Sequence, residues 1–482
     1  MATATIEQLQ PLTKLLVDAG LQSQLLLPND DKYQASVDSY WSNTTKQRPA
    51  CIIKPESSAQ VAKALSAIVS ANQKFAIRSG GHSPLAGVNN IQDGVTIDLT
   101  HFTNIEFDEN TKTVSFGPGV RWKHVHKCLE KYGYAVAGGR ENEVGVGGFI
   151  LGGGNCWMTG RRGFACDNVV AFEVVLADGR IVTADANTHA DLFKALKGGS
   201  NNFGIVTNFT MRTFIIPGGK LWGGVALSSK EQIPEGIKMT VNFTNRIADY
   251  PDTSLISFFT HTIEAKDIVL AAALCETQGV SDSPTFKEWS TLPQINNTTK
   301  HKTPIEIGIE TFVPANYFST WFTITFKNDE RILTKIAEVH QKLVNDLISY
   351  TGGHDFITQA ILQPMPTVFA ERSIEAGGNV MGLERNSSNG MLLQLTTMVQ
   401  TADQREFACT KAKGYVEEVK ELATSLDGLF DWIYLNYADK TQAVLESYGT
   451  ENVKFMKEVS RKYDPDQVFQ KLCPGGFKLA DV

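Results

Sequence analysis

The sequence lacks the features that would place the chain outside the ordinary globular proteins. Its longest apolar run, Ile268 to Cys275, is far too short to span a bilayer, so we expect no membrane partner. Positive charge is not in excess, because 45 basic residues stand against 52 acidic ones, and the net charge of −7 argues against a nucleic-acid partner. The first residues, MATATIEQLQPL, contain no basic segment followed by an apolar core. We therefore expect no secretory signal and a cytoplasmic location.

Paired cysteines are also lacking. The seven cysteines are an odd number and include no CxxC pair, which favours reduced, buried thiols over a disulfide framework or a metal site. His124 and His126 lie two residues apart in an expected helix, so their side chains point to different faces. We expect no bound metal.

Glycine, in contrast, is abundant, and one cluster lies in the segment RSGGHSPLAG, Arg78 to Gly87. It directly follows the apolar residues Phe75 to Ile77, which predict a short strand. Gly80 and Gly81 allow the backbone to approach a bulky anion, and successive N–H groups in such a turn can bind a pyrophosphate. His82 then stands as a nucleophile where a phosphate-bearing cofactor would lie. A plain turn is the alternative interpretation.

A second glycine cluster spans Glu141 to Gly154, where six of fourteen residues are glycine. This density is too high for an ordinary strand or helix, so the backbone is expected to approach another group closely. The segment is not a dinucleotide-binding fingerprint, because Ile150 stands where the GxGxxG pattern needs its last glycine. Tight turns packed in a protein core are the alternative.

The 482 residues are enough for two or three domains. The first third alternates strands and helices and includes a predicted hairpin, Phe172 to Thr183, around Asp178-Gly179. The composition changes near Pro217. From there, strand-like runs such as Met391 to Val399 alternate with helical ones, which predicts an antiparallel sheet covered by helices and an α+β fold. The expected segments are 1–216, 217–428 and 429–482.

The last segment opens with WIYLNY, Trp432 to Tyr437, which alternates with period two. The simplest interpretation is a buried strand. Asn436 and Tyr437 would also suit a pocket that needs an amide and a phenol.

Seven ordered motifs resemble those of the berberine-bridge-enzyme-like FAD-linked oxidases, which have the vanillyl-alcohol-oxidase type of FAD-binding domain (PCMH-type). The resemblance covers nearly the whole chain. In order, the motifs are RSGGHSPLAG, GPGVRW (Gly117–Trp122), VGVGGFILGGG (Val144–Gly154), DNVVAFEVVLADG (Asp167–Gly179), KGGSNNFGIVTNFT (Lys197–Thr210), NYAD (Asn436–Asp439) and KYDPDQVF (Lys462–Phe469).

The resemblance implies an FAD-binding domain made of residues 1–216 together with 429–482, and a substrate domain, 217–428, above the isoalloxazine ring. His82 matches the residue that bonds to the 8α-methyl carbon of the flavin, and the turn Gly145 to Gly148 would run along the flavin. The implied FAD-binding residues are Arg78, Ser79, Gly80, Gly81, His82, Ser83, Gly87, Pro118, Gly119, Val144, Gly145, Gly147, Gly148, Gly152, Gly204, Val206, Asn436 and Tyr437.

The chain departs from the family pattern at two positions. Glu141 stands where many members carry a cysteine that forms a second flavin link, so the resemblance implies attachment through His82 alone. Phe149 replaces a frequent histidine. Val144, however, matches the small residue that lets dioxygen reach the reduced flavin, which favours an oxidase over a dehydrogenase.

The implied reaction passes a hydride from the substrate to the flavin, and dioxygen then reoxidises the flavin and yields hydrogen peroxide. Tyr437 matches a frequent catalytic tyrosine of the family, although packing on the flavin is an equal alternative. Asn436, Gln394 and Thr396 are the other candidate catalytic residues. Related enzymes place an acid in the strand that contains Gln394 and Thr396, whereas these positions are uncharged, which suits a neutral substrate.

We expect a small or medium-sized hydrophobic alcohol or amine of specialised metabolism as the substrate, oxidised with or without ring closure. The alternatives are a redox-neutral cyclase or isomerase with a structural FAD, a carbohydrate oxidase, and a flavin-free binding protein.

Overall fold

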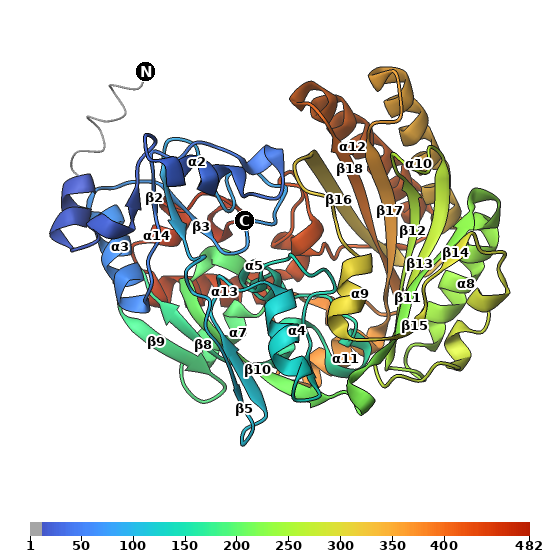
Figure 1. Ribbon diagram of the computed structural model, residues 1–482, viewed down its shortest axis with the longest axis horizontal. Coiled ribbons are helices and arrows are strands. Elements are labelled where there is room, and N and C mark those ends of the chain that lie inside the picture. The colour runs from blue at the N-terminus through green and yellow to red at the C-terminus, as the bar shows by residue number, and fades with distance from the viewer. Residues whose placement is uncertain (1–11) are drawn as a thin grey trace.

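The computed structural model describes residues 12–482, so the N-terminal residues used to predict the missing secretory signal lie mostly outside it. Figure 1 shows two bodies side by side. One combines the N-terminal part of the chain with the C-terminal segment, and the other contains the middle of the chain. None of the helices in the described part combines the length and apolarity that crossing a membrane requires.

The first body contains a small sheet in the order β1-β2-β4-β3, in which β4 pairs in parallel with both β2 and β3. Its strands are β1 (Leu25–Leu26), β2 (Cys51–Ile53), β3 (Phe75–Arg78) and β4 (Val95–Asp98). Helix α3 (Ser58–Ser70) covers the sheet with buried Val61 and Leu65, and the Ser57 hydroxyl accepts the N–H of Gln60 at its start. The predicted strand before the glycine turn is confirmed as β3.

A second sheet of the same body is antiparallel and follows the order β5-β6-β10-β8-β9, with β7 also paired to β10. The β8–β9 pair confirms the predicted hairpin around Asp178-Gly179. The strands are β5 (Ile105–Asp108), β6 (Thr113–Phe116), β7 (Tyr134–Val136), β8 (Val169–Val175), β9 (Ile181–Asp185) and β10 (Ile205–Ile215). The helices that accompany these two sheets are α2 (Asp31–Asp38), α4 (Trp122–Glu130), α5 (Val146–Leu151), α6 (Thr159–Arg162) and α7 (Ala190–Leu196).

The second body is a nine-stranded antiparallel sheet in the order β14-β11-β13-β12-β17-β18-β16-β19, with β15 also paired to β11. Its longest helices, α8 (Ile233–Arg246), α10 (Glu330–Thr351) and α12 (Ala402–Ser425), cover one face of the sheet (Figure 1). The strands are β11 (Leu221–Ser229), β12 (Thr253–His261), β13 (Ile268–Glu276), β14 (Asn296–Asn297), β15 (Lys300–Lys302), β16 (Phe318–Lys327), β17 (Ile357–Met365), β18 (Gly390–Val399) and β19 (Leu429–Phe430). The fold class is α+β, as predicted.

The chain passes from the first body to the second between the end of β10 at Ile215 and the start of β11 at Leu221, and it leaves the second body after β19 ends at Phe430. Two shorter helices of the middle segment, α9 (Pro304–Glu310) and α11 (Thr367–Glu375), lie between the bodies in Figure 1. After β19 the chain returns to the first body through α13 (Thr450–Tyr463) and α14 (Val468–Lys471), and there Phe469 packs against Phe75 of β3.

The strand predicted for Trp432 to Tyr437 is wrong. The segment is irregular and ends in a 3₁₀ turn, Leu435–Tyr437. Its aromatic side chains bond to backbone groups of other segments, since Trp432 donates to the carbonyl of Met381 and the hydroxyl of Tyr434 accepts the N–H of Gly154. The alternating pattern of this segment therefore reflects the burial of its aromatic side chains, and the segment does not pair with another strand in the part of the chain that the structure describes.

Candidate active site

A cavity of about 630 Å³ lies between the two bodies. Loops of the first body form one wall, which we call the flavin side, and the uncovered face of the nine-stranded sheet forms the other, which we call the substrate side. Most of the predicted site residues line this cavity, and they come from segments far apart in the sequence. They are Ser79, Gly80, Gly81, His82, Ser83, Pro118, Val144, Gly145, Gly147, Gly148, Gly204, Val206, Gln394, Thr396, Asn436 and Tyr437.

Arg78, a predicted cofactor-binding residue, does not line the cavity. Its buried guanidinium stacks 3.9 Å from the ring of Tyr40 and lies 3.6 Å from the carboxylate of Asp98. It also donates to the carbonyl of Ser36 at 2.9 Å and to the hydroxyl of Ser39 at 2.7 Å. Arg78 therefore braces the glycine turn from behind, because both of its terminal nitrogens donate to protein groups.

Three predicted glycines, Gly87, Gly119 and Gly152, also lie away from the cavity lining. Gly87 bends the end of the turn with a φ of +90°. A Cβ at Gly119 would lie 2.5 Å from the carbonyl oxygen of Leu99, and one at Gly152 would collide with the side chain of Asn436. Packing against other protein atoms thus requires Gly119 and Gly152, and the left-handed backbone favours glycine at position 87.

The expected turn at Gly145 to Gly148 is wrong, because Val146 to Leu151 form helix α5. A Cβ at Gly145 would lie 2.5 Å from the Cα of Gly80, and one at Gly147 would lie 2.8 Å from the hydroxyl oxygen of Ser79. The two glycine clusters thus pack backbone against backbone. Of Gly145, Gly147 and Gly148, only Gly148 has open space where a Cβ would stand, so this glycine leaves room for a ligand in the cavity.

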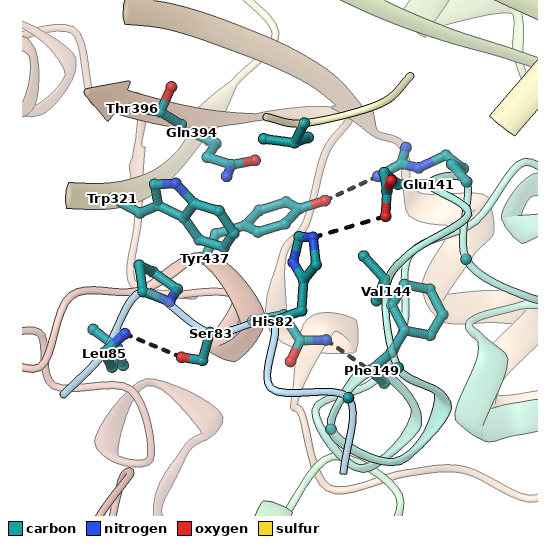
Figure 2. Close-up of a pocket in the computed structure, with 18 of the residues that line it drawn as sticks. His82, Ser83, Leu85, Glu141, Val144, Phe149, Trp321, Gln394, Thr396 and Tyr437 are labelled. Atoms are coloured by element: carbon teal, nitrogen blue, oxygen red, sulfur yellow. Dashed lines mark hydrogen bonds and ion pairs between the residues drawn. The ribbon is translucent and has the colours of Figure 1, made fainter. Parts of the chain in front are cut away.

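His82 lies at the centre of the flavin side (Figure 2). Its ring stacks on Trp41 with centroids 4.6 Å apart and planes inclined by 16°. Burial, and then the positive charge of Arg121, lower the pKa of His82 to about 4. The imidazole is therefore neutral at physiological pH and keeps a nitrogen lone pair.

Glu141 lies beside this imidazole, with its Oε2 atom 3.8 Å from Nε2 of His82 (Figure 2). Oε2 also accepts the backbone N–H of Glu143 at 2.8 Å, whereas Oε1 is buried without a hydrogen-bond partner. Burial is the main cause that raises the pKa of Glu141 to about 7. The contact is therefore not a salt bridge, because burial disfavours the charged form of both groups.

Tyr437 projects into the cavity above His82 (Figure 2). Its phenol oxygen accepts a 2.9 Å hydrogen bond from Nη2 of Arg140, which also donates to Gln363 at 2.7 Å. Trp321 packs edge-on against the phenol ring, with centroids 6.1 Å apart. The positively charged guanidinium of Arg140 is thus hydrogen-bonded to the phenol oxygen, the atom through which Tyr437 could exchange a proton.

Asn436 has a structural partner. Its amide Nδ2 donates to the carbonyl of Phe149 at 3.1 Å and to the hydroxyl of Tyr434 at 3.2 Å. The amide thus connects the C-terminal segment to helix α5 and positions its neighbour Tyr437.

The substrate side consists of alternate residues on adjacent strands. The cavity-facing residues of β18 are Gln394, Thr396 and Met398, and the intervening residues face the covering helices. The neighbouring strands contribute mainly apolar side chains, so the wall is apolar with a few amides and hydroxyls. These residues are Ile256, Phe258 and Thr260 of β12 and Ile357, Gln359, Ile361 and Gln363 of β17.

Comparison with known proteins identifies the cofactor. Residues 49–185 match the FAD binding domain family. The chain is 36% identical to the FAD-dependent monooxygenase drtC of Aspergillus calidoustus over 472 residues, which cover 97% of this chain and 90% of the relative. The chain belongs to the berberine-bridge-enzyme-like family of FAD-linked oxidoreductases.

Two solved structures share the fold of this FAD-linked oxidoreductase at low identity. A BBE-like protein of Physcomitrella patens has a TM-score of 0.76 at 18% identity, with 95% of this chain and 97% of that chain covered. The glucooligosaccharide oxidase of Acremonium strictum has a TM-score of 0.76 at 17% identity, with 95% and 98% covered. The latter is described as carrying a 6-S-cysteinyl, 8α-N1-histidyl FAD.

The residues of this family member fit FAD. The open position at Gly148 leaves room for a ligand in the cavity that His82 also lines. The lowered pKa keeps the imidazole of His82 neutral, so a ring nitrogen with a lone pair is available to the cofactor.

Four residues that contact the predicted site residues, or each other, were not predicted from the sequence. Arg140, Trp321 and Gln363 line the cavity, and Trp41 stacks on His82. None lies in a motif that indicates chemistry. Arg140 directly precedes the second glycine cluster, and this proximity is the only signal that could have singled it out.

Proposed function

We propose that the protein is an oxidase that oxidises a small or medium-sized apolar alcohol or amine, with FAD attached to His82 and dioxygen as the final electron acceptor. FAD supplies the hydride acceptor and the means of reducing dioxygen to hydrogen peroxide. The observation that carries the proposal is the Arg140–Tyr437 hydrogen bond directly above His82 (Figure 2).

His82 and the glycine clusters would hold the cofactor. Ser79 to Ser83 and Gly148 would surround the flavin, and Val206 lines the same side of the cavity. The histidyl link of the glucooligosaccharide oxidase supports attachment at His82. Glu141, which cannot form a cysteinyl thioether, supports a single covalent link.

Tyr437 would act as the base that takes the proton from the substrate O–H or N–H. Arg140 donates to the phenol oxygen, so its positive charge stabilises a tyrosinate at that atom. Gln363 receives a second hydrogen bond from the same guanidinium and holds its orientation. Proton removal at Tyr437 would thus accompany hydride loss from the adjacent carbon.

Val144 supports the choice of dioxygen as oxidant. Its short side chain lines the flavin side next to Gly145, at the position where the family pattern implies access for dioxygen. A bulkier residue there would reduce this access.

The substrate side favours an apolar metabolite over a carbohydrate. Ile256, Phe258, Ile361 and Met398 offer no hydrogen bonds to a row of sugar hydroxyls. Gln394 and Thr396 are two of the polar groups on this side that could orient one functional group, and the Oγ1 atom of Thr396 has no hydrogen-bond partner among residues 12–482. We place such a substrate in specialised metabolism.

Oxygen uptake with a panel of apolar alcohols and amines tests the proposal. We expect one hydrogen peroxide for each dioxygen consumed and a product that has lost two hydrogens. A product isomeric with the substrate, formed without oxygen uptake, would instead indicate redox-neutral catalysis. A product that has gained an oxygen atom without peroxide release would indicate a monooxygenase, the activity in the name of the Aspergillus relative.

A further inference from the structure

We propose that Glu141 is a positioning residue for flavin attachment: it orients the imidazole of His82 and accepts the proton that His82 loses when the bond to FAD forms. This inference rests on the proposed attachment at His82 and assigns a role to the residue that replaces the family's second linking cysteine.

Nε2 of His82 faces the carboxylate of Glu141. The atom is buried without a hydrogen-bond partner, and Oε2 of Glu141 lies 3.8 Å away. Trp41 covers one face of the imidazole, so the ring is held in its plane. Figure 2 shows the second ring nitrogen, Nδ1, on the side of the ring turned away from Glu141. One nitrogen thus faces the carboxylate, and the other is left for the cofactor.

The carboxylate is itself held in place. Oε2 accepts the backbone N–H of Glu143 at 2.8 Å. Arg121 donates to the carbonyl of Glu143 and, at 3.2 Å, to the carbonyl of Gly80, two residues before His82. One guanidinium therefore joins the segment of Glu141 to the turn of His82 and keeps the two side chains together.

Glu141 also has an unused acceptor. Its Oε1 atom has no hydrogen-bond partner among residues 12–482, and solvent cannot supply one, because the side chain is only 9% exposed and the atom is buried. Such an unsatisfied buried oxygen is costly unless it serves a function or gains a partner later. With a pKa raised by burial to about 7, the carboxylate can accept a proton from an imidazolium near neutral pH.

The attachment step can be written in balanced form. With the proton of the neutral ring on Nε2, Nδ1 of His82 forms a C–N bond to the 8α-methyl carbon of the flavin, and one C–H bond of that methyl group breaks. The carbon is oxidised, and its two electrons reduce the flavin. The imidazole, now alkylated at Nδ1, gives its Nε2 proton to Glu141, and the methyl proton passes to solvent. Dioxygen takes up the two electrons and two protons as hydrogen peroxide.

The test is to separate total flavin from covalent flavin in purified holoprotein variants. Glu141→Gln keeps the shape of the side chain and removes its basicity, so we expect total flavin to remain while the covalent fraction falls about tenfold or more. In Glu141→Ala, added formate should restore covalent flavin, whereas chloride should not. Glu130→Gln, which changes an exposed acid at the end of α4, is the matched control, and we expect wild-type attachment.

The outcomes are distinct. A Glu141→Gln protein as covalent as the wild type, or an alanine variant insensitive to formate, would overturn the role of Glu141 and leave attachment at His82 intact. A wild-type protein that releases all its flavin on denaturation would overturn both. A fall in covalent flavin with unchanged total flavin excludes a merely structural role for Glu141, because loss of structure would lower total and covalent flavin together.

Discussion

The two sides of the cavity are built in different ways. On the flavin side, Gly80 and Gly145 bring two backbones together where a Cβ would lie only 2.5 Å from the opposite chain. On the substrate side, alternate side chains of β12, β17 and β18 form the wall, and each can be exchanged without moving a strand. The comparison teaches that cofactor binding depends here on the path of the backbone, whereas substrate choice depends on replaceable side chains.

Tyr437 lies where the two sides meet, and its replacement should have the largest effect. Tyr437→Phe removes the phenol oxygen that we propose as the proton acceptor and that bonds to Arg140, but it keeps the ring that packs on Trp321. We expect kcat to fall about 10²- to 10⁴-fold with flavin content unchanged, as measured by oxygen uptake and absorbance. Tyr350→Phe, at a phenol 48% exposed on α10, is the control and should leave kcat unchanged. Wild-type turnover in Tyr437→Phe would remove this residue from the chemistry.

Alanine substitutions at two glycines of the flavin side should separate the effect of protein packing on stability from the effect of ligand contact on flavin binding. In Gly80→Ala the new Cβ meets the backbone at Gly145, so we expect the free energy of unfolding to fall by about 1–3 kcal/mol together with loss of flavin. In Gly148→Ala the new Cβ meets no protein atom within 4 Å, so stability should be kept and only flavin binding weakened. Thermal denaturation and flavin absorbance measure the two effects. Equal stability losses in both variants would contradict the difference between these glycines.

Glu141 makes the stability of the flavin side depend on pH. Burial raises its pKa from the ordinary 4.5 to about 7, so the folded protein favours the protonated acid. The resulting stability is fully present below about pH 4.5 and is lost as the pH rises toward 7. Relative to Glu141→Gln, the flavin-free wild type should lose no more than about 3 kcal/mol over this range, measured by denaturation at each pH. Parallel curves for the two proteins would contradict this prediction.

A small change on the substrate side should have the smallest effect. Ile361→Val removes one methylene from the cavity wall, a loss of about 0.8 kcal/mol of apolar contact, so we expect KM to rise about fourfold with kcat and flavin content unchanged. Leu362→Val is the matched control, because Leu362 lies on the opposite face of β17 and should affect stability alone. A change in KM with Leu362→Val, and none with Ile361→Val, would contradict the assignment of Ile361 to the cavity face of β17 and of Leu362 to the opposite face.

The glycine motifs and the hairpin could be predicted because their signals are local. The Arg140–Tyr437 bond joins residues 297 positions apart, and the stacking of Trp41 on His82 likewise depends on the folded chain. The strand predicted for Trp432 to Tyr437 failed for a related reason: its alternation reflects burial of aromatic groups that bond to distant backbone atoms. The motifs thus indicated the cofactor, whereas the contacts that surround it could not be predicted.

Acid precipitation of the purified protein tests most directly whether FAD is attached at His82. A yellow pellet from the wild type and a colourless pellet with a yellow supernatant from His82→Ala are the predicted results. A colourless wild-type pellet, or a pellet that stays yellow in His82→Ala, would contradict attachment at this residue.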